Sequence, residues 1–438
     1  MEIIEKLEII DNTSEGLGVA KLKNVTIFVK NTLINDIVDV YVVEKKKNFW
    51  IAKVKNFKKY SEFRNNSFDE KLSEVYPFIN LNYDKEIQIK KNIIINNFRK
   101  NAKITLNDID ILKSERFFNY RNKIELKIDD DFELCYCIEN GENKVKIENC
   151  PVTNENINEF LPFLKNKLKE YKIKAYDFNT DCGNLKNISI RCNSSSEIIL
   201  TLVVKAYNKK IEDLVKNLSN YKNLIAGYVS INNKKNSVLI SNDIKEIFIK
   251  KEFKDNIGKY VFKISPKSFF QVNSYQTENL YNVASDFLGK NKNLTLLDLY
   301  CGIGTTTIYF SENFKKVIGV EVVKDSIKDA KQNAKLNSIE NVEFVYGKSE
   351  EKIEQILKQN NIDIVSVDPP RKGLDKKIIE SISKSKIKKI VYISCNSATL
   401  ARDIKLFQDI GFTIEKIKAV DMFSKTPHVE AIALIQKI

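Results

Sequence analysis

The residues with the clearest chemical potential stand where apolar runs of the sequence end. The run at 294–300 leads into a turn that contains Gly302 and Gly304, and a later run ends at Glu321. Glycine lets the backbone turn tightly beside a ligand, and a carboxylate at a strand end can accept hydrogen bonds from both hydroxyls of a ribose. Because Thr307 replaces the third glycine of the dinucleotide pattern, the turn favours an adenosine cofactor without a pyrophosphate, which points to S-adenosylmethionine. The alternative is a structural turn at Gly302 with a solvated Glu321.

Three more groups of this kind follow at the ends of later runs. Asp368 precedes two prolines, which stiffen the loop that leaves the run, and Cys395 directly follows KIVYIS. Glu430 stands just before the last apolar run, in DMFSKTPHVE. A cysteine thiolate is a strong nucleophile near neutral pH, and a partly buried carboxylate can act as a base. We expect these strand ends to bring a cofactor site, a nucleophile and a base to one cleft.

The elements that position these groups can be predicted from hydrophobic patterning. After Val261, amphipathic segments such as 324–337 and 398–410 separate six apolar runs. The runs lie at 294–300, 316–322, 342–347, 362–370, 389–395 and 431–436. Fully apolar strands that alternate with helices are typical of a mostly parallel sheet covered on both faces. The prediction is a Rossmann-like, doubly wound α/β domain at 256–438, with ligands beyond the carboxyl ends of its strands.

Two other regions precede this domain. Residues 1–58 contain five short β-branched runs, which predict a small OB-like barrel. Residues 59–255 mix strand-like and helix-like runs, which predict an α+β central domain. Helices are expected near 84–100, 154–170 and 209–222.

Composition narrows the classes of function. The 438 residues carry 72 basic and 58 acidic side chains, a net charge of +14 that suits a polyanion such as RNA, although A/T-rich coding would give a similar bias. Lysines 45–47 beside Phe49 and Trp50 would offer RNA charge and stacking surfaces, unless these aromatics are barrel core.

His428 is the only histidine, which excludes HExxH zinc proteases and histidine-ligated metal clusters. The seven cysteines are expected to be thiols, and without a leader or a long apolar stretch we expect a cytoplasmic monomer that makes no membrane contact.

Several motifs closely resemble those of the RNA uracil-C5 methyltransferase family. They are SPKSFFQVN (265–273), LDLYCGIG (297–304), DPPRKG (368–373), SCN (394–396) and DMFSKTPHVE (421–430). Residues 1–58 resemble the TRAM domain of that family, and FFNYRNKIELKI (117–128) resembles an element of its central domain. The resemblance implies a nucleophile, Cys395, and a catalytic base, Glu430. It also implies four residues that bind S-adenosylmethionine: Gln271, Tyr300, Glu321 and Asp368.

The residue types suit the chemistry that this resemblance implies. Uracil C5 is too weak a nucleophile to take a methyl group directly, so a thiolate must first add to C6. Cys395 is the predicted thiolate, while Cys301 lies inside the glycine turn and is interpreted as a small residue in a tight space. His428 is interpreted as a neutral partner packed against the last strand, with orienting or proton relay as the alternative. The target base must leave its stack, and either Phe269 or Phe270 is the candidate wedge.

The chain departs from the family pattern in one respect. Many relatives carry a [4Fe-4S] cluster held by four cysteines, three of them soon after the TRAM domain, but the matching segment 61–86 contains no cysteine. Cys150 resembles the fourth ligand, and one thiolate cannot hold a cluster that needs four. No metal and no iron-sulfur cluster is therefore expected.

The RNA target is set by the resemblance alone. Bacterial relatives with a TRAM domain mostly act on 23S rRNA, which favours 23S rRNA over tRNA here. The alternatives are a tRNA uracil-5 methyltransferase and a non-catalytic RNA-binding or RNA-remodelling protein on the same fold. The presence of both Cys395 and Glu430 disfavours the non-catalytic alternative.

Overall fold

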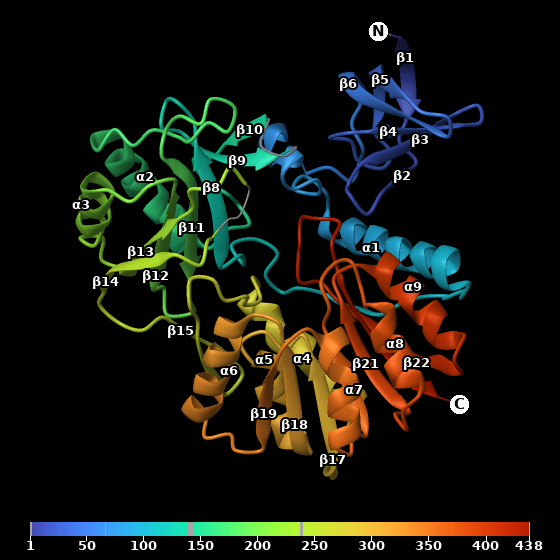
Figure 1. Ribbon diagram of the computed structural model, residues 1–438. Coiled ribbons are helices and arrows are strands. Elements are labelled where there is room, and N and C mark those ends of the chain that lie inside the picture. The colour runs from blue at the N-terminus through green and yellow to red at the C-terminus, as the bar shows by residue number, and fades with distance from the viewer. Residues whose placement is uncertain (1, 66, 139–142, 237–239, 438) are drawn as a thin grey trace. The chain divides into compact units, whose positions relative to one another are not determined.

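The computed structural model describes residues 2–65, 67–138, 143–236 and 240–437 (Figure 1). The chain divides into two compact units. The first comprises Met1–Phe117, Pro369–Leu374 and Tyr392–Ile438, and the second comprises Phe118–Asp368 and Asp375–Val391. No helix within the described ranges has both the length and the apolar character that crossing a membrane requires.

The first unit begins with a six-stranded sheet in the order β1-β5-β6-β4-β3-β2. Its strands are β1 (Ile3–Glu8), β2 (Asp11–Asn12), β3 (Gly18–Leu22), β4 (Val25–Val29), β5 (Ile37–Lys45) and β6 (Phe49–Lys59). Ile27, Val38 and Val40 are among its fully buried core residues, and Ile10 N–H donates to Val19 O (2.8 Å) beside the pairing of β2 with β3. All five predicted strands are present. The sixth, β2, has two residues, too few to show a hydrophobic alternation.

The aromatic residues at the start of β6 combine the two roles considered for them. Phe49 and Trp50 are half-buried, and Trp50 packs against the barrel core. The Lys45 ammonium lies 4.1 Å from the centre of the Trp50 ring, and the Lys46 ammonium lies 5.5 Å from that of Phe49. Trp50 therefore contacts both the core and a cation, and Phe49 contacts a cation.

A helix follows the barrel in the first unit. The 3-10 helix η1 (Glu70–Glu74) comes first, and α1 (Tyr83–Asn97) begins where the Asn82 side chain accepts a hydrogen bond from Asp84 N–H (2.9 Å). The helix continues as a π-helical turn, η2 (Phe98–Ala102), and ends at Lys103 in the left-handed conformation (φ 58°). The predicted helix near 84–100 is therefore confirmed, although its last turn is wider than α-helical.

The last part of the chain also belongs to the first unit. Helix α9 (Ser397–Gln408) leads to β22 (Phe412–Val420), which pairs antiparallel with β23 (Glu430–Lys437) and parallel with the short β7 (Ile111–Leu112). Val420 and Glu430 are register partners, so residues 421–429 form a connection whose two ends meet.

The second unit contains a seven-stranded sheet in the order β10-β9-β8-β11-β12-β13-β14. Its strands are β8 (Lys123–Ile128), β9 (Leu134–Ile138), β10 (Asn143–Lys146), β11 (Leu185–Cys192), β12 (Ile198–Val204), β13 (Leu224–Ile231) and β14 (Ile244–Ile249). Helices α2 (Glu155–Glu170) and α3 (Lys209–Leu218) confirm the two predicted helices, α3 being shorter than expected. A two-stranded ribbon, β15 (Lys254–Ile257) and β16 (Tyr260–Lys263), follows.

The second unit also holds four parallel strands in the order β19-β18-β17-β20. They are β17 (Asn291–Leu299), β18 (Phe314–Glu321), β19 (Val342–Tyr346) and β20 (Ile364–Val367). The helices around them are α4 (Ser274–Leu288), α5 (Thr305–Phe310), α6 (Lys324–Leu336), α7 (Ser349–Gln359) and α8 (Lys376–Ser383), with the 3-10 turn η4 (Ser311–Asn313). This is the doubly wound pattern that the apolar runs predicted. Strand β21 (Lys389–Ser394) then carries the chain from the second unit into the first.

Candidate active site

The end of β17 holds a buried carboxylate. Asp298 is 1% exposed, and its Oδ2 accepts hydrogen bonds from the hydroxyls of Thr306 (2.7 Å) and Thr307 (2.6 Å) at the start of α5. Burial raises the pKa of Asp298 to about 6, and the two threonine hydrogen bonds oppose that rise. Thr307, which breaks the dinucleotide pattern, thus fixes the helix start to the strand end. Sequence reasoning noted Thr307 only as a missing glycine.

Both glycines of the turn between β17 and α5 have positive φ, but their surroundings differ. Gly304 has φ +83°, and a Cβ there would come within 3.0 Å of the Phe344 ring and 3.1 Å of Ala330. Gly302 has φ +56°, and a Cβ there would meet nothing within 4 Å. Only glycine readily adopts these positive φ values, so both positions favour it. The open space beside Gly302 leaves this turn accessible to a ligand.

Glu321 at the end of β18 supports the same turn. Its Oε2 accepts a hydrogen bond from Gly302 N–H (3.2 Å), and its Oε1 accepts one from Val323 N–H (2.7 Å). A carboxylate has about four lone-pair sites, so two bonds leave capacity for ribose hydroxyls. Glu321 is half-buried and not the fully solvated side chain of the alternative interpretation. The neighbouring Tyr300 holds a positive φ of 68°, and its N–H donates to Val320 O (2.9 Å).

Asp368 follows β20, which pairs with β17 on the side away from β18. Its N–H donates to Leu299 O (3.4 Å), which ties the start of the proline-containing loop to the end of β17. Desolvation raises the pKa of Asp368 to about 7, and the negative charge of Asp298 contributes to the same rise. The carboxylates of Asp298 and Asp368 therefore influence one another electrostatically.

Gln271 lies in a loop that is held at both ends. Its carbonyl accepts a hydrogen bond from the Asn122 side chain (3.0 Å), while Ser265 and Ser268 both donate to Asp329 Oδ2 (2.8 Å each). Arg191 adds a hydrogen bond to Ser268 O (2.9 Å). The loop is therefore fixed by the central sheet and by α6 together.

The two phenylalanines of that loop have opposite environments. Phe270 is 2% exposed and lies 6.3 Å from Phe262, ring centre to ring centre, whereas Phe269 is 67% exposed. Phe270 is a core residue, and Phe269 is the one available to a stacking partner.

In the first unit, Cys395 lies between β21 and α9. It is a partly exposed thiol outside any disulfide. The next residue, Asn396, caps α9 by accepting a hydrogen bond from Ala398 N–H (3.0 Å). Its side-chain amide donates to Arg371 O (3.1 Å), and Thr399 Oγ1 donates to the same carbonyl (3.2 Å). The loop around Arg371 is thus fixed beside the cysteine.

Glu430 opens β23 and is 4% exposed. Two residues earlier, His428 Nε2 lies 3.2 Å from the Arg371 guanidinium. A guanidinium only donates hydrogen bonds, so Nε2 acts as the acceptor and carries no proton. The role of His428, as a neutral partner or as an orienting group, stays a prediction. Arg371 is the functional candidate that sequence reasoning missed, because its motif gave no sign that it joins the Cys395 and Glu430 segments.

The remaining cysteine of the glycine turn has a structural place. Cys301 is 2% exposed, and burial raises its pKa well above the ordinary value. A Cβ at Gly319 would approach its sulfur to 2.9 Å. This agrees with its interpretation as a small residue in a tight space.

The predicted site residues fall into two sets. The cofactor candidates Gln271, Tyr300, Glu321 and Asp368 belong to the second unit, and the reactive candidates Cys395 and Glu430 belong to the first. Within the described ranges, no group of three or more His, Cys, Asp or Glu side chains is arranged to hold a metal ion.

Comparison with known proteins gives a consistent family. The family model described as tRNA (Uracil-5-)-methyltransferase matches residues 82–438. An uncharacterized RNA methyltransferase of Clostridium acetobutylicum is 33% identical over 98% of this chain and 95% of its own length. One of Fusobacterium nucleatum is 35% identical over 96% of this chain and 93% of its own.

A solved structure supports the same relation. The tRNA (uracil-54, C5)-methyltransferase of Pyrococcus abyssi, crystallised with S-adenosyl-L-homocysteine, is 28% identical to this chain with a TM-score of 0.80. The match covers 98% of this chain and 100% of that one.

Proposed function

From the premise that this chain belongs to the tRNA (uracil-5-)-methyltransferase family and is an S-adenosylmethionine-dependent RNA uracil-5 methyltransferase, we propose which residues perform the reaction and which RNA is modified. The nucleophile is Cys395 and the base is Glu430. The cofactor is held by Gln271, Tyr300, Glu321 and Asp368. The target is a uridine of 23S rRNA, and the three predicted domains 1–58, 59–255 and 256–438 share its recognition and modification.

The first chemical step belongs to Cys395. Its thiolate adds to uracil C6, which forms an S–C6 bond and moves the C5–C6 π electrons onto C5 and O4 as an enolate. S-adenosylmethionine, when bound, would supply the methyl group to C5 and leave as S-adenosylhomocysteine. The partial exposure of Cys395 supports this role, whereas the enclosed thiol of Cys301 is held in its protonated form.

The last step belongs to Glu430. Its carboxylate takes the C5 proton, the C5–C6 double bond forms again, and the S–C6 bond breaks to release Cys395 as a thiolate. The proton remains on Glu430 until it passes to solvent. The low exposure of Glu430 supports this role because it limits competition by water for the carboxyl group.

One observation carries the assignment. Arg371 accepts hydrogen bonds on its carbonyl from the residues that follow Cys395, and its guanidinium contacts His428, two residues before Glu430. A single side chain and its backbone thus tie the nucleophile's segment to the base's segment. Catalysis by two groups requires such a fixed relation.

The target is proposed to be 23S rRNA on the resemblance of residues 1–58 to the TRAM domain, and the barrel that they form has cation and aromatic pairs suited to RNA. Phe269 is the residue that stacks on the unpaired substrate strand, given its exposure on a rigidly held loop. A tRNA target is the second candidate, because the Pyrococcus abyssi relative is named for a uracil in tRNA.

The nucleophile can be tested by replacing Cys395→Ala and, as a matched control, the exposed Cys182→Ala. The first variant should lose 5-methyluridine formation while it still binds RNA and S-adenosylmethionine, and the control should behave as wild type. With RNA containing 5-fluorouracil, wild type and control should form a denaturant-stable adduct, because fluorine cannot leave as a proton does. Substantial 5-methyluridine from Cys395→Ala would refute the assignment.

The target can be tested with labelled S-adenosylmethionine and separately purified 23S rRNA and tRNA that lack the modification. Incorporation into 23S rRNA, mapped to one uridine by mass spectrometry, is the expected result. Incorporation into tRNA alone would replace the rRNA proposal by the second candidate and would leave the mechanism unchanged.

A further inference from the structure

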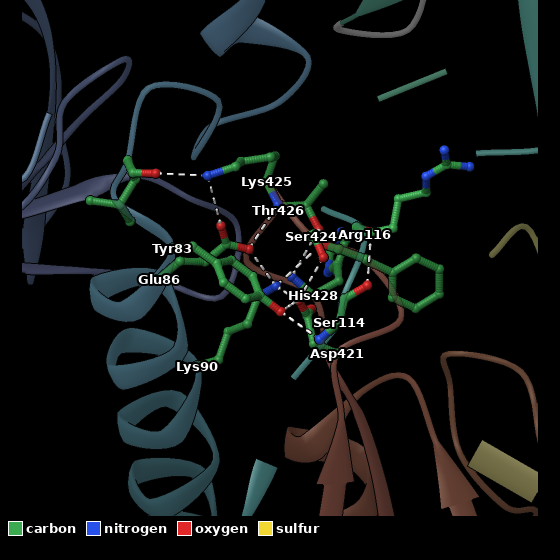
Figure 2. A network of polar contacts seen from close by, with 12 residues as sticks. Tyr83, Glu86, Lys90, Ser114, Arg116, Asp421, Ser424, Lys425, Thr426 and His428 are labelled. Carbon is green, nitrogen blue, oxygen red and sulfur yellow. Dashed lines mark hydrogen bonds and ion pairs between the residues drawn. The ribbon is translucent and has the colours of Figure 1, made fainter. Parts of the chain in front are cut away.

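Helix α1 carries ionisable residues on its buried face. Lys90 is fully buried, and its ammonium contacts three oxygens: Glu86 Oε1 (2.7 Å), Asp421 Oδ1 (2.6 Å) and the Phe423 carbonyl (3.2 Å). Figure 2 shows Glu86, Lys90 and Asp421 converging between the helix and the connection of residues 421–429. All three of the ammonium's hydrogen bonds are therefore used, two of them by that connection.

The connection is held at further points. Asp421 Oδ2 accepts hydrogen bonds from Tyr83 (2.7 Å) and Ser424 (2.6 Å). Glu86 Oε1 accepts one from Lys425 N–H (2.7 Å), and Lys425 holds a positive φ of 67°, which is unusual for a lysine. The helix thus fixes both the side chains and the strained backbone of the connection.

The Lys425 ammonium completes the group. It donates to Leu81 O (2.8 Å) and lies 3.7 Å from Glu86 Oε2. Two carboxylates, Glu86 and Asp421, and two ammonium groups, Lys90 and Lys425, therefore share one enclosed space, and the Tyr83 hydroxyl also faces it.

This arrangement is an inefficient way to gain stability alone. Enclosing four charges requires their desolvation, and apolar residues of similar volume often stabilise a fold equally well or better. What the charges add is directionality, because the hydrogen bonds of Lys90, Asp421 and Glu86 Oε1 all depend on where the connection places its donors and acceptors. That connection ends at Glu430, after passing His428 and its contact with Arg371.

We propose that Glu86 and Lys90 are positioning residues, which hold residues 421–428 in the one conformation that presents Glu430 to the substrate. The inference rests on the proposed role of Glu430 as the base. Loss of the network should then slow proton removal from C5 more than the earlier steps. The enzyme would accumulate as a methylated covalent adduct with RNA, which ordinarily breaks down at once.

The test compares Lys90→Met with Lys91→Met. Lys91 is the next residue of the same helix and pairs at the surface with Asp108 (3.0 Å). Lys90→Met should lower kcat by about 10- to 100-fold, the scale of a misplaced catalytic group, with a much smaller change in KM for S-adenosylmethionine. With ordinary uracil RNA, a denaturant-stable adduct should accumulate in Lys90→Met and stay at the wild-type level in Lys91→Met.

A second variant separates positioning from stability. Lys90→Met with Glu86→Gln removes one charge of each sign, so the enclosed group is again neutral, but the bridge from the helix to Asp421 stays broken. We expect its melting temperature to recover toward wild type, while kcat stays low and the adduct still accumulates. Recovery of both kcat and adduct breakdown would overturn the inference and leave the network a purely stabilising role.

Two more measurements make every outcome decisive. If neither Lys90 variant folds, Tyr83→Phe removes one hydrogen bond to Asp421 without changing any charge, and a wild-type adduct level in this variant would also count against positioning. If wild-type enzyme forms no adduct even with 5-fluorouracil RNA, the proposed mechanism fails. If it does, and Lys90→Met breaks down its adduct normally, only the positioning role fails.

Discussion

Asp298 in the second unit, and Glu86 and Asp421 in the first, are carboxylates with 1% exposure or less. Their hydrogen-bond partners differ in kind. Asp298 is held by two neutral hydroxyls, Thr306 and Thr307. Glu86 and Asp421 share the ammonium of Lys90. The first group lies at a strand end beside a turn with open space at Gly302, and the second holds a connection that leads to a catalytic candidate.

This difference in partners determines how each group responds to protonation and to the loss of one partner. Asp298 has a pKa of about 6, so it can take up a proton and keep its hydroxyl partners in hydrogen-bonding positions. The pKa of Glu86 is raised by burial to about 7, although Lys90 opposes the rise, and the pKa of Lys90 is itself raised by the two carboxylates despite burial. Losing a hydroxyl leaves a hydrogen bond unmade. Losing Lys90 leaves two buried carboxylates against one lysine.

The largest expected effect is therefore on stability, in Lys90→Met. Breaking a buried ion pair by removing one partner costs about 3 to 5 kcal/mol, so the free energy of unfolding in urea should fall by that amount. Lys91→Met should lower it by about 1 kcal/mol or less, since its pair with Asp108 is solvent-exposed. If the free energy of unfolding fell equally in the two variants, the enclosed group would contribute no more to stability than an ordinary surface pair.

A carboxylate held by backbone amides offers an intermediate case. Glu321→Ala should weaken S-adenosylmethionine binding by about 1 to 3 kcal/mol, the usual loss for hydrogen bonds to a charged group. Glu321→Gln keeps one acceptor oxygen for Gly302 N–H and should lose less. Titration calorimetry measures both, with the exposed Glu312→Ala as control. Unchanged affinity in Glu321→Ala would move the ribose contact to another residue, and RNA affinity should not change.

The contrast between the two groups also shows what a sequence can reveal. The glycine turn, Glu321 and the strands that carry them were predictable, because apolar runs and their polar ends are local features. The barrel strands were predictable for the same reason. Thr307 lies only nine residues from Asp298, to which it donates a hydrogen bond. Hydroxyl partners of this kind produce no periodic pattern in a sequence, so the contact could not be predicted.

The charged group of the first unit could not be predicted in this way. Lys90 and Asp421 are 331 residues apart in the chain, and a lysine in an amphipathic helix normally indicates the solvent side. Likewise, nothing local in DPPRKG indicates that Arg371 touches His428. Which of Phe269 and Phe270 is exposed needed the structure too, because alternation allows either residue to face the core.

The pH dependence of stability should distinguish Asp298 as well. Its folded-state pKa of about 6 lies above the ordinary value of 3.8, so the protonated form favours folding. That contribution is complete below about pH 4 and is lost as the pH rises through 6. Asp298→Asn should flatten this fall, by at most about 1.4 kcal/mol per pH unit for one group. It should also lower the pKa of Asp368, which loses a negative neighbour.

The control for this measurement is Asp286→Asn at an exposed position of the same unit. Unfolding free energies from urea titrations between pH 4 and 7 should keep the wild-type slope in the control. An unchanged slope in Asp298→Asn would assign the titration to Asp368 or Glu86, whose pKa values of about 7 place their transitions higher.

The smallest expected effect concerns the buried thiols. Because we expect them to hold no iron, chelation should change nothing. Burial raises the pKa of Cys135 to about 11 and that of Cys192 to about 12, so both favour the protonated thiol, whereas iron requires thiolates. Cys150 is buried with its sulfur 3.6 Å from the Tyr136 hydroxyl, and segment 61–86 supplies no cysteine. The purified protein should therefore lack absorbance near about 400 nm and keep its melting temperature and activity after chelation in air. Stoichiometric iron and acid-labile sulfide in anaerobically prepared protein would contradict this, and would mean that folding lowers the pKa of several of these thiols together, against the effect of burial.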